Sequence, residues 1–348
     1  MKRNFSFSEE FGPKTQFIFS EICTFSFSQK GAYFRSQKKI SSKANKDSFA
    51  LKFAFLLIKF FFAVLKCLPL RLSWELACGL GTVFYHCSKR SYRIGMQNLD
   101  YVYGKSISLP RKRKILLRSF QSLAMTFVEL FVLPAQIYSQ RKKAKNFIIL
   151  QGLRHLENAL SRQKGVIIVS PHLGAWEAAG ILSSFSSYPF HSIAKPLHNI
   201  RLSQWIAEQR ISTGACLIDR KGAMKICQYL LAQNKLIVIL ADQRVPYRQR
   251  MQVRFLGRAA MLTKSVALLS LQTGAPILPG YCYRDRKRQR YVFVYDRPIY
   301  PDRKGRRRNR EEVFRLTQAW ANQLSKFIVA QPELYLWSHR LFRDFISY

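Results

Sequence analysis

Hydrophobic residues occur along this chain both in short runs and at helical spacing, and the two patterns alternate. Short runs rich in Val, Ile and Leu predict strands at residues 165–170, 191–194, 216–218, 235–240, 277–283 and 291–295. Apolar positions at helical spacing predict helices at residues 72–87, 112–132, 176–184, 203–212, 223–232, 263–274 and 311–331. Strands that alternate with helices are typical of a parallel sheet covered on both faces. We therefore expect a mixed α/β fold with a largely parallel sheet flanked by helices.

The most apolar stretch, residues 49–70, precedes this alternating region. It is long enough to cross a bilayer, whose hydrocarbon core needs about 20 residues. Lys52, Lys59 and Lys66 interrupt it at regular intervals. Lys59 would stand near the bilayer centre, where a charge costs about 2.5–3.5 kcal/mol. Two interpretations stay open: a transmembrane anchor, or an amphipathic helix in the interface with its lysines toward anionic head groups.

The first 48 residues differ in composition from the rest of the chain. Ser, Lys and Gln dominate residues 29–46, and the segment lacks the continuous apolar region of a secretory signal. We expect a disordered extension, or a stretch upstream of the true translation start. The pattern therefore predicts three parts: an extension at 1–48, a membrane anchor helix at 49–70 and an α/β domain at 71–348.

The charge balance is extreme, with 58 Lys and Arg against 19 Asp and Glu and a formal net charge of +39. Such a surface attracts polyanions: nucleic acid, an anionic membrane, a phosphorylated lipid or an acidic carrier protein. Basic runs at 284–290 and 303–310 are of a kind usually found in solvated loops. No helix-turn-helix, zinc-finger or RNA-recognition motif accompanies the charge, so we expect no specific nucleic-acid partner.

The cysteines indicate neither a disulfide framework nor a metal site. There are seven, an odd number, and they are scattered without Cys-x-x-Cys or Cys/His ligand spacing. A reducing, cytoplasmic setting fits this usage. We expect no bound metal.

The candidate chemistry lies where the predicted strand 165–170 ends. Pro171 stops the strand, His172 follows at once, and Glu177 stands at the start of the next predicted helix. Ligands bind at the carboxyl edge of strands in open α/β sheets. A His at that edge, with a carboxylate nearby, can act as a general base in a fixed tautomer. From the pattern alone, a structural histidine of the core or of a loop is the alternative.

The same spacing recurs at His339 and Asp344, in an aromatic and basic stretch with no strand-turn signal. The residues around His172 are more specific. Residues 170–177, Ser-Pro-His-Leu-Gly-Ala-Trp-Glu, resemble the signature block of the lysophospholipid acyltransferase superfamily. They are most similar to the late acyltransferases of lipid A biosynthesis in Gram-negative bacteria. Further blocks agree in order, at residues 193–199, 217–222, 240–246, 255–257 and 337–340.

The resemblance extends from about Ser48 to the C-terminus, with two departures. Lys195 stands where the family usually has Arg, and Arg244 replaces the usual second Asp of an Asp-Gln-Asp run. The second departure removes a carboxylate from that block and leaves Asp242 as its acid.

The resemblance implies an acyltransferase domain at 71–348. It would move a fatty acyl chain from an acyl carrier protein thioester to a hydroxyl of a lipid A precursor. No cofactor beyond that co-substrate is implied, and no covalent acyl-enzyme. The protein would lie at the cytoplasmic side of the bacterial inner membrane, which presents an anionic surface. The basic residues that flank the apolar stretch also favour the cytoplasmic side.

The roles that the resemblance implies fall on eight residues. His172 would be the general base, and Glu177 would bond the other imidazole nitrogen. Lys195, Arg220 and Lys221 would bind phosphate or the developing oxyanion, and Asp242 would orient one of these cations or the acceptor. The candidate substrate-binding residues are therefore Lys195, Arg220, Lys221, Asp242, Gln243 and Arg244.

Two other functions stay open. The first is another lysophospholipid acyltransferase, although the Phe-Pro-Glu-Gly-Thr-Arg-like block of glycerolipid enzymes is missing. The second is a non-catalytic basic protein that binds membranes or RNA on the same scaffold. His172→Ala separates an enzyme from a binding protein. Acyl-chain length, the acylated position of the lipid and oligomeric state are not indicated by the sequence.

Overall fold

The computed structural model describes residues 49–139, 146–194, 199–220, 222–302 and 309–348. The predicted extension at 1–48 therefore lies outside the described residues. So do Lys195, Lys221 and most of the basic run at 303–310.

A seven-stranded sheet forms the centre of the molecule, in the order β1-β9-β8-β2-β5-β3-β4. Every neighbouring pair is parallel except β8 and β9, which form an antiparallel hairpin. The strands are β1 (Ile148–Gln151), β2 (Val166–Ser170), β3 (Phe190–Ala194), β4 (Cys216–Asp219), β5 (Leu236–Leu240), β8 (Ile277–Asp285) and β9 (Arg290–Tyr295). The predicted mixed, mostly parallel sheet is confirmed.

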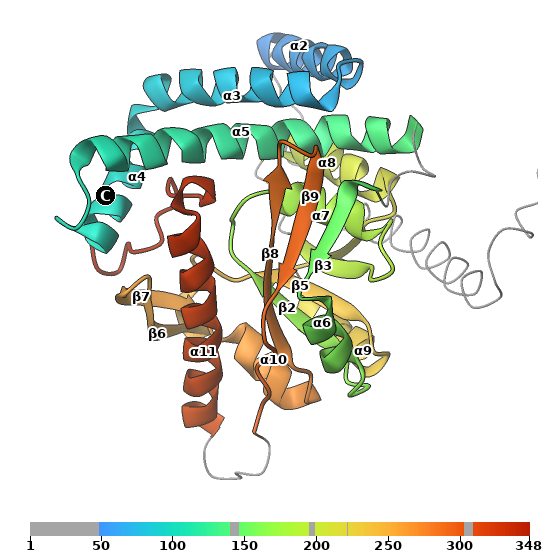
Figure 1. The fold of residues 1–348 in the computed structure, drawn as a ribbon, viewed down its shortest axis with the longest axis vertical. Helices are drawn as coiled ribbons and strands as arrows, with labels where there is room; N and C mark the ends of the chain where they lie inside the picture. Colours follow the sequence, from blue (N-terminus) through green and yellow to red (C-terminus); the bar gives the residue numbers. More distant parts are fainter. Residues whose placement is uncertain (1–48, 140–145, 195–198, 221, 303–308) are drawn as a thin grey trace, which may run out of the picture.

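Helices cover both faces of this sheet (Figure 1). One face packs against α9 (Ala223–Ala232), α10 (Ser265–Thr273) and α11 (Asn309–Ala330). The other packs against α5 (Leu109–Ser139), α6 (Leu153–Leu160), α7 (Trp176–Ser183) and α8 (Ile200–Ser212). The side chains of β2 supply both layers, because Ile167 and Val169 point into one core and Val166 and Ile168 into the other.

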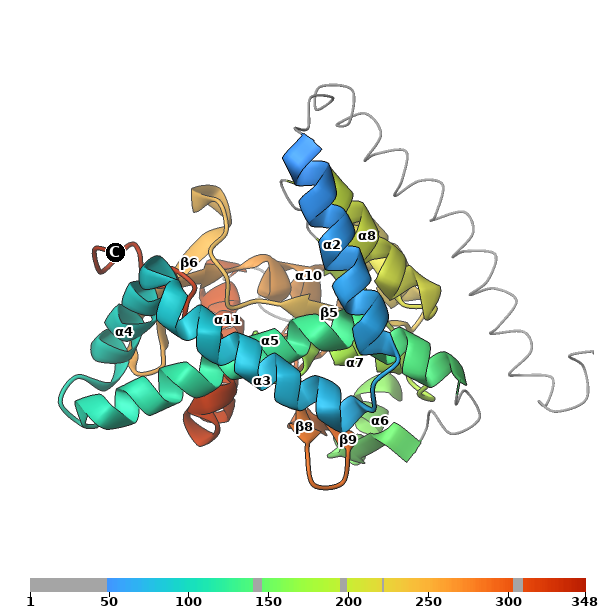
Figure 2. The ribbon, with the colours of Figure 1, turned by 90° about the horizontal axis from the view of Figure 1, so that it is seen from above.

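A third layer lies outside α5. It consists of α2 (Phe49–Lys66) and α3 (Leu70–Cys87), which cross the top of the molecule in Figure 1 and are seen from above in Figure 2. The helix predicted over 49–70 thus ends at Lys66, and a second helix begins at Leu70. By length and hydropathy, α5 is the one described helix that could cross a membrane, over Leu109–Ile137. Because 67% of its most apolar window is buried against α3 and the sheet, it serves as a core helix.

Several elements were not predicted. These are β1, α6, α4 (Lys89–Tyr103), and the hairpin of β6 (Arg250–Phe255) and β7 (Arg258–Thr263), which follows the short helix η2 (Tyr247–Gln249). β1 is short and only half-buried, and β6 carries exposed polar side chains, so neither has a long apolar run. α4 has few apolar residues but buries Ile94 and Leu99. Tertiary contact, rather than local hydrophobicity, defines these segments.

Candidate active site

His172 lies at the carboxyl edge of the sheet, two residues beyond the end of β2. All five residues of β2 are buried. Pro171 ends the strand because proline has no backbone N–H with which to continue the ladder. His172 therefore lies at a strand end, as predicted, and at the edge of the sheet where α/β proteins bind ligands.

The turn after His172 is held tightly against β8. Gly174 has a φ of +71°, and a Cβ at this position would come 2.3 Å from the carbonyl oxygen of Cys282. The N–H of Ala175 donates to that same carbonyl at 2.7 Å. The Thr126 hydroxyl of α5 donates to the carbonyl of Gly174 at 2.9 Å. Only glycine permits this approach, so the loop that carries His172 has one defined path.

Asp242 is the carboxylate that contacts His172. β2 and β5 are adjacent, with Ser170 paired to Leu240, and both residues stand two positions beyond that pair. Oδ1 of Asp242 lies 2.6 Å from Nδ1 of His172, and Oδ2 accepts the backbone N–H of His172 at 2.9 Å. Burial alone would raise the pKa of Asp242, but the charge and hydrogen bonds of His172 outweigh it and lower that pKa. The carboxylate is therefore ionised at neutral pH.

This pairing fixes the tautomer of the neutral imidazole. An ionised carboxylate can only accept hydrogen bonds, so Nδ1 of His172 carries the proton. The other nitrogen, Nε2, then has a free lone pair. The side-chain nitrogen of Gln243 lies 2.9 Å from it, in position to donate. The ring thus presents its basic nitrogen beside Gln243.

Glu177 has a different partner from the predicted one. Its carboxylate accepts two hydrogen bonds from Arg210 of α8, at 2.9 Å from Nε and 2.7 Å from Nη2. The prediction that Glu177 bonds the imidazole of His172 is wrong, because Asp242 takes that place. Asp242 likewise orients His172 rather than a cation. Glu177 lies in the first turn of α7 and faces α8, so its carboxylate projects toward Arg210.

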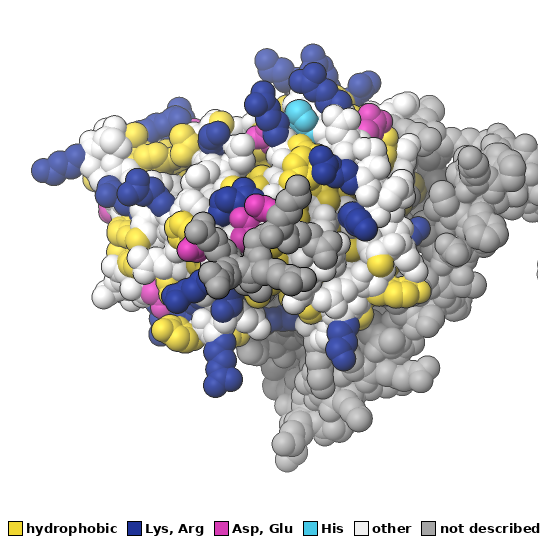
Figure 3. All heavy atoms as spheres, turned by 90° about the horizontal axis from the view of Figure 1, so that it is seen from below, with side chains coloured by type: hydrophobic (Ala, Val, Ile, Leu, Met, Phe, Trp, Pro, Cys, Tyr) yellow, Lys and Arg dark blue, Asp and Glu magenta, His cyan; other side chains and the backbone are white. Residues whose placement is uncertain are grey.

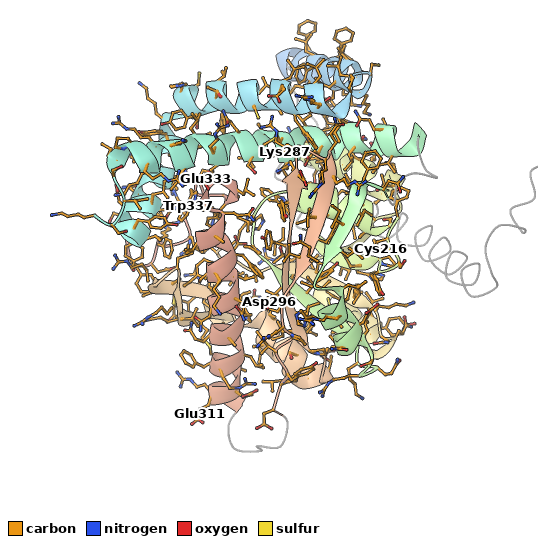
Figure 4. The ribbon with its side chains drawn as sticks, viewed as in Figure 1. Cys216, Lys287, Asp296, Glu311, Glu333 and Trp337 are labelled. Carbon is orange, nitrogen blue, oxygen red and sulfur yellow. The ribbon has the colours of Figure 1, made fainter. Side chains whose placement is uncertain are left out.

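The chain end packs against the loop that carries His172. The N–H of Leu336 donates to the carbonyl of His172 at 3.1 Å, and the N–H of Gly174 donates to the carbonyl of Leu334 at 3.0 Å. Two further hydrogen bonds hold this C-terminal segment. The hydroxyl of Ser119 donates to the carbonyl of Tyr335, and the side-chain amide of Asn98 donates to the carbonyl of Trp337. Figure 4 places Glu333 and Trp337 beside α4 and α5.

Two side chains of the C-terminal segment face Asp242. Burial, and then the charge and hydrogen bonding of Asp242, raise the pKa of Tyr335 well above its usual value. Burial lowers the pKa of His339, and the charge of Asp242 partly opposes that shift. Neither residue has a predicted role, although residues 337–340 form one of the blocks that resemble the family.

A cavity of about 490 Å³ opens beside His172. Its polar part includes His172, Gln243, Glu177 and three arginines: Arg210, Arg220 and Arg244. Its apolar lining includes residues on the face of the sheet that α7 covers (Ile168, Ala179, Phe190, Val238, Phe293 and Tyr295) and residues of α9 and α10 (Ala223, Met224, Cys227 and Leu269). This size is typical of small-molecule sites, and a polar end joined to an apolar end suits an amphiphile.

The predicted site residues are only partly brought together. Arg220, Gln243 and Arg244 line the same cavity as His172, whereas Lys195 and Lys221 lie outside the described residues. Arg244 is 3.6 Å from the carboxylate of Asp344, which also binds Arg250 at 2.9 Å. Across the described ranges, no group of three or more His, Cys, Asp or Glu side chains is placed to hold a metal.

A buried ion pair contacts the loop that follows His172. Arg284 of β8 contacts Glu129 of α5 through Nε at 2.5 Å and Nη2 at 2.7 Å. The side chains are 3% and 0% exposed. Trp74 and Tyr291 also donate to Glu129, and Arg284 donates to the carbonyl of Gly174 at 3.1 Å. The network joins α3, α5, the sheet and the loop after His172.

Arg284→Met is expected to lower the free energy of unfolding by about 3–5 kcal/mol, because it leaves the buried charge of Glu129 unpaired. Chemical denaturation followed by fluorescence measures the change. The matched control is Arg315→Met, which breaks an exposed pair with Glu312 on α11 and should cost at most about 1 kcal/mol. Equal losses in the two variants would contradict a structural role for the network.

The sequence also matches a known protein family. A model of the bacterial lipid A biosynthesis acyltransferase family matches residues 42–344. The chain belongs to this family. The match includes His172, Glu177, Asp242 and the C-terminal segment as far as Asp344.

Individual members of this family and related proteins are similar at low identity. A phosphatidylinositol mannoside acyltransferase of Mycobacterium tuberculosis is 28% identical over 220 residues, 62% of this chain and 66% of that protein. This match spans just under two thirds of the mycobacterial protein. The lipid A biosynthesis lauroyltransferase of Escherichia coli (strain K12) is 24% identical over 279 residues, 79% of this chain and 87% of that protein.

A lipid A biosynthesis acyltransferase of Haemophilus influenzae is 25% identical over 291 residues, covering 82% of this chain and 86% of that protein. Among solved structures, the 1-acyl-sn-glycerophosphate acyltransferase PlsC of Thermotoga maritima aligns with a TM-score of 0.34 and 15% identity. That alignment covers 73% of this chain and 97% of that chain.

Proposed function

We propose that this protein transfers a fatty acyl chain from an acyl carrier protein thioester to a hydroxyl of a lipid A precursor. The observation that carries the proposal is the His172–Asp242 pair at the end of a cavity with polar and apolar parts. The relatives that match over the largest share of this chain are named for lipid A biosynthesis, which supports this acceptor.

The proton balance follows from the tautomer of His172. The acceptor hydroxyl takes the place of the Gln243 amide at Nε2 and gives its proton to that nitrogen as its oxygen attacks the thioester carbonyl carbon. Asp242 stabilises the imidazolium that forms. The carbon–sulfur bond then breaks, and the proton passes from Nε2 to the leaving thiolate. The products are an ester and a free carrier thiol, with no acyl-enzyme.

Gln243 and the arginines complete this scheme. Once displaced from Nε2, the Gln243 amide is a donor beside the reacting carbon and can stabilise the oxyanion. Arg210, Arg220 and Arg244 outnumber Glu177 on the cavity wall, so the polar end favours an anionic substrate group such as phosphate. The apolar part would hold the acyl chain.

A second acceptor class has a specific observation in its favour. The phosphatidylinositol mannoside acyltransferase is more similar, at 28% identity, than the lipid A enzymes at 24% and 25%. The experiment offers the purified protein one acyl carrier protein thioester and three acceptors: a tetra-acylated lipid A precursor, a phosphatidylinositol mannoside and a lysophospholipid. Preferred acylation of the lipid A precursor supports the proposal. Preferred acylation of another acceptor replaces it with that class.

We also propose that α2 and α3 bind the surface of the cytoplasmic leaflet of the bacterial inner membrane, with α2 lying in the interface rather than crossing it. One side of α2 packs on the body of the protein, where the rings of Phe62 and Phe131 are 4.2 Å apart and Leu65 is buried. The outer sides of the two helices expose large apolar side chains: Phe53, Leu56, Leu57, Ile58, Phe60, Phe61, Val64, Leu72, Leu76, Leu80, Val83 and Phe84. Exposed apolar side chains gathered on two successive helices mark an interaction surface.

Basic residues accompany this layer. Arg286, in the turn between β8 and β9, binds Glu75 of α3 at 2.6 Å, and Lys287 follows it in the same turn. Anionic head groups attract such residues by about 1 kcal/mol each. On the face seen from below, opposite α2 and α3, hydrophobic side chains form small patches among Lys and Arg (Figure 3).

Phe60→Asp is expected to reduce binding to vesicles that contain anionic phospholipid by about tenfold or more, because Phe60 is 69% exposed at the proposed contact. Flotation of the purified protein with vesicles measures the bound fraction. The matched control is Phe314→Asp on α11, which is 47% exposed but lies away from α2 and α3 and should bind as the wild type does. Equal binding by all three proteins would reject this surface.

A further inference from the structure

Gly180 leaves open space at the wall of the cavity. It lies on α7 and is one of the residues that line the cavity beside His172. A Cβ built at this position meets no heavy atom within 4 Å. Gly280, a lining residue on β8, differs: a Cβ there would come 2.8 Å from the carbonyl oxygen of Val294. Packing therefore requires glycine at position 280 but does not require it at position 180.

Gly180 lies one helical turn along α7 from the residues that are close to His172. Trp176 begins the helix with its ring 5.4 Å from that of His172, and Glu177 faces Arg210. Gly180 follows one helical turn later on the same side, about 6 Å further along the axis. A side chain at position 180 would therefore enter the cavity on its α7 side, whose apolar lining includes Ile168, Phe190 and Phe293.

We infer that the absence of a side chain at Gly180 sets the length of the acyl chain that this protein transfers. The inference rests on the proposed function, since it takes the apolar part of the cavity as the site of the donor's acyl chain. A larger residue at position 180 would shorten that space without touching His172, Asp242 or Gln243. One methylene more or less in an apolar pocket changes kcat/KM by about 10- to 200-fold.

The test compares wild type, Gly180→Ala and Gly180→Leu in acyl transfer from acyl carrier protein thioesters of 10, 12, 14 and 16 carbons. Gly180→Leu should move the preferred donor to a chain shorter by about two to four carbons and change the ratio of short to long donors at least about tenfold. Gly180→Ala should shift the ratio in the same direction by less. Alanine also favours the helix more than glycine does, so this variant should fold.

Gly79→Leu is the matched control. Gly79 is also a helical glycine with no atom within 4 Å of a built Cβ, but it lies on α3 and does not line the cavity. This variant should keep the wild-type ratio between donors. Thermal unfolding of each variant, and transfer from the shortest donor, separate a shortened cavity from a misfolded protein.

Each outcome has a distinct meaning. Absence of transfer by the wild type with every donor and acceptor would overturn the proposed function itself. Transfer by the wild type with the same donor preference in Gly180→Ala and Gly180→Leu would overturn the role of Gly180 and leave the proposed function intact. The role of Gly180 would also be overturned if a folded Gly180→Leu lost transfer from all donors while Gly180→Ala kept the wild-type donor preference.

Discussion

His172→Ala is expected to reduce acyl transfer by about 10²–10⁴-fold, the usual contribution of a positioned general base. The reason is that Nε2 of His172 is the basic nitrogen at the polar end of the cavity, held by Asp242 at 2.6 Å from Nδ1. Initial rates of lipid acylation at saturating donor measure the effect. The loss should fall on kcat, because the side chain assists the chemical step rather than donor binding.

The matched control is His191→Ala. His191 is also largely buried, but it lies on β3, does not line the cavity and contacts the carbonyl of Leu236 at 3.3 Å. Both variants should keep the wild-type circular dichroism spectrum. If His172→Ala retained wild-type turnover, a protein with a non-catalytic role on this scaffold would be the better account.

Asp242→Asn is expected to cost about 10⁴-fold in turnover, as the corresponding change does in serine triads. The geometry explains why a neutral isostere fails. The backbone N–H of His172 donates to Oδ2 at 2.9 Å, so the amide oxygen of an Asn must take that position. The amide NH₂ would then face Nδ1 of His172 and force the proton onto Nε2. The imidazole would have no lone pair for the acceptor hydroxyl.

Glu177→Gln is the matched comparison, a carboxylate-to-amide change on the same cavity wall. Because Glu177 bonds Arg210 and not His172, its loss should reduce turnover by no more than about tenfold. Assays of both variants at one donor concentration decide between the two carboxylates. A severe loss in Glu177→Gln with a mild loss in Asp242→Asn would reverse the assignment and restore the interpretation drawn from sequence.

Local sequence pattern was sufficient for the position of His172 but not for its partner. The apolar run of β2, Pro171 and the start of α7 are contiguous, so the strand–turn–helix unit follows from nearest neighbours. The contact with Asp242 spans 70 residues and depends on β5 lying beside β2. Strand order is a property of the whole sheet, whereas the assignment of Glu177 rests on its nearness in sequence and on the family resemblance of residues 170–177.

The C-terminal segment illustrates the same limit. Tyr335 and His339 approach Asp242 because α11 returns the chain to the loop of His172, where Leu336 and Leu334 pair with it. No periodicity indicates such a return. The lysines of α2 leave both a membrane-spanning and an interfacial helix open, and they could not predict that Phe62 and Leu65 pack on the body of the protein.

The most direct test follows a radiolabelled acyl chain from acyl carrier protein through the purified protein. With direct attack by the acceptor, the label is expected to enter the lipid A precursor when this acceptor is present, and the protein is expected to carry no covalent label in its absence. His172→Ala is expected to move almost no label. A stable acyl-protein adduct, or label transfer that survives His172→Ala, would contradict direct attack assisted by the His172–Asp242 pair.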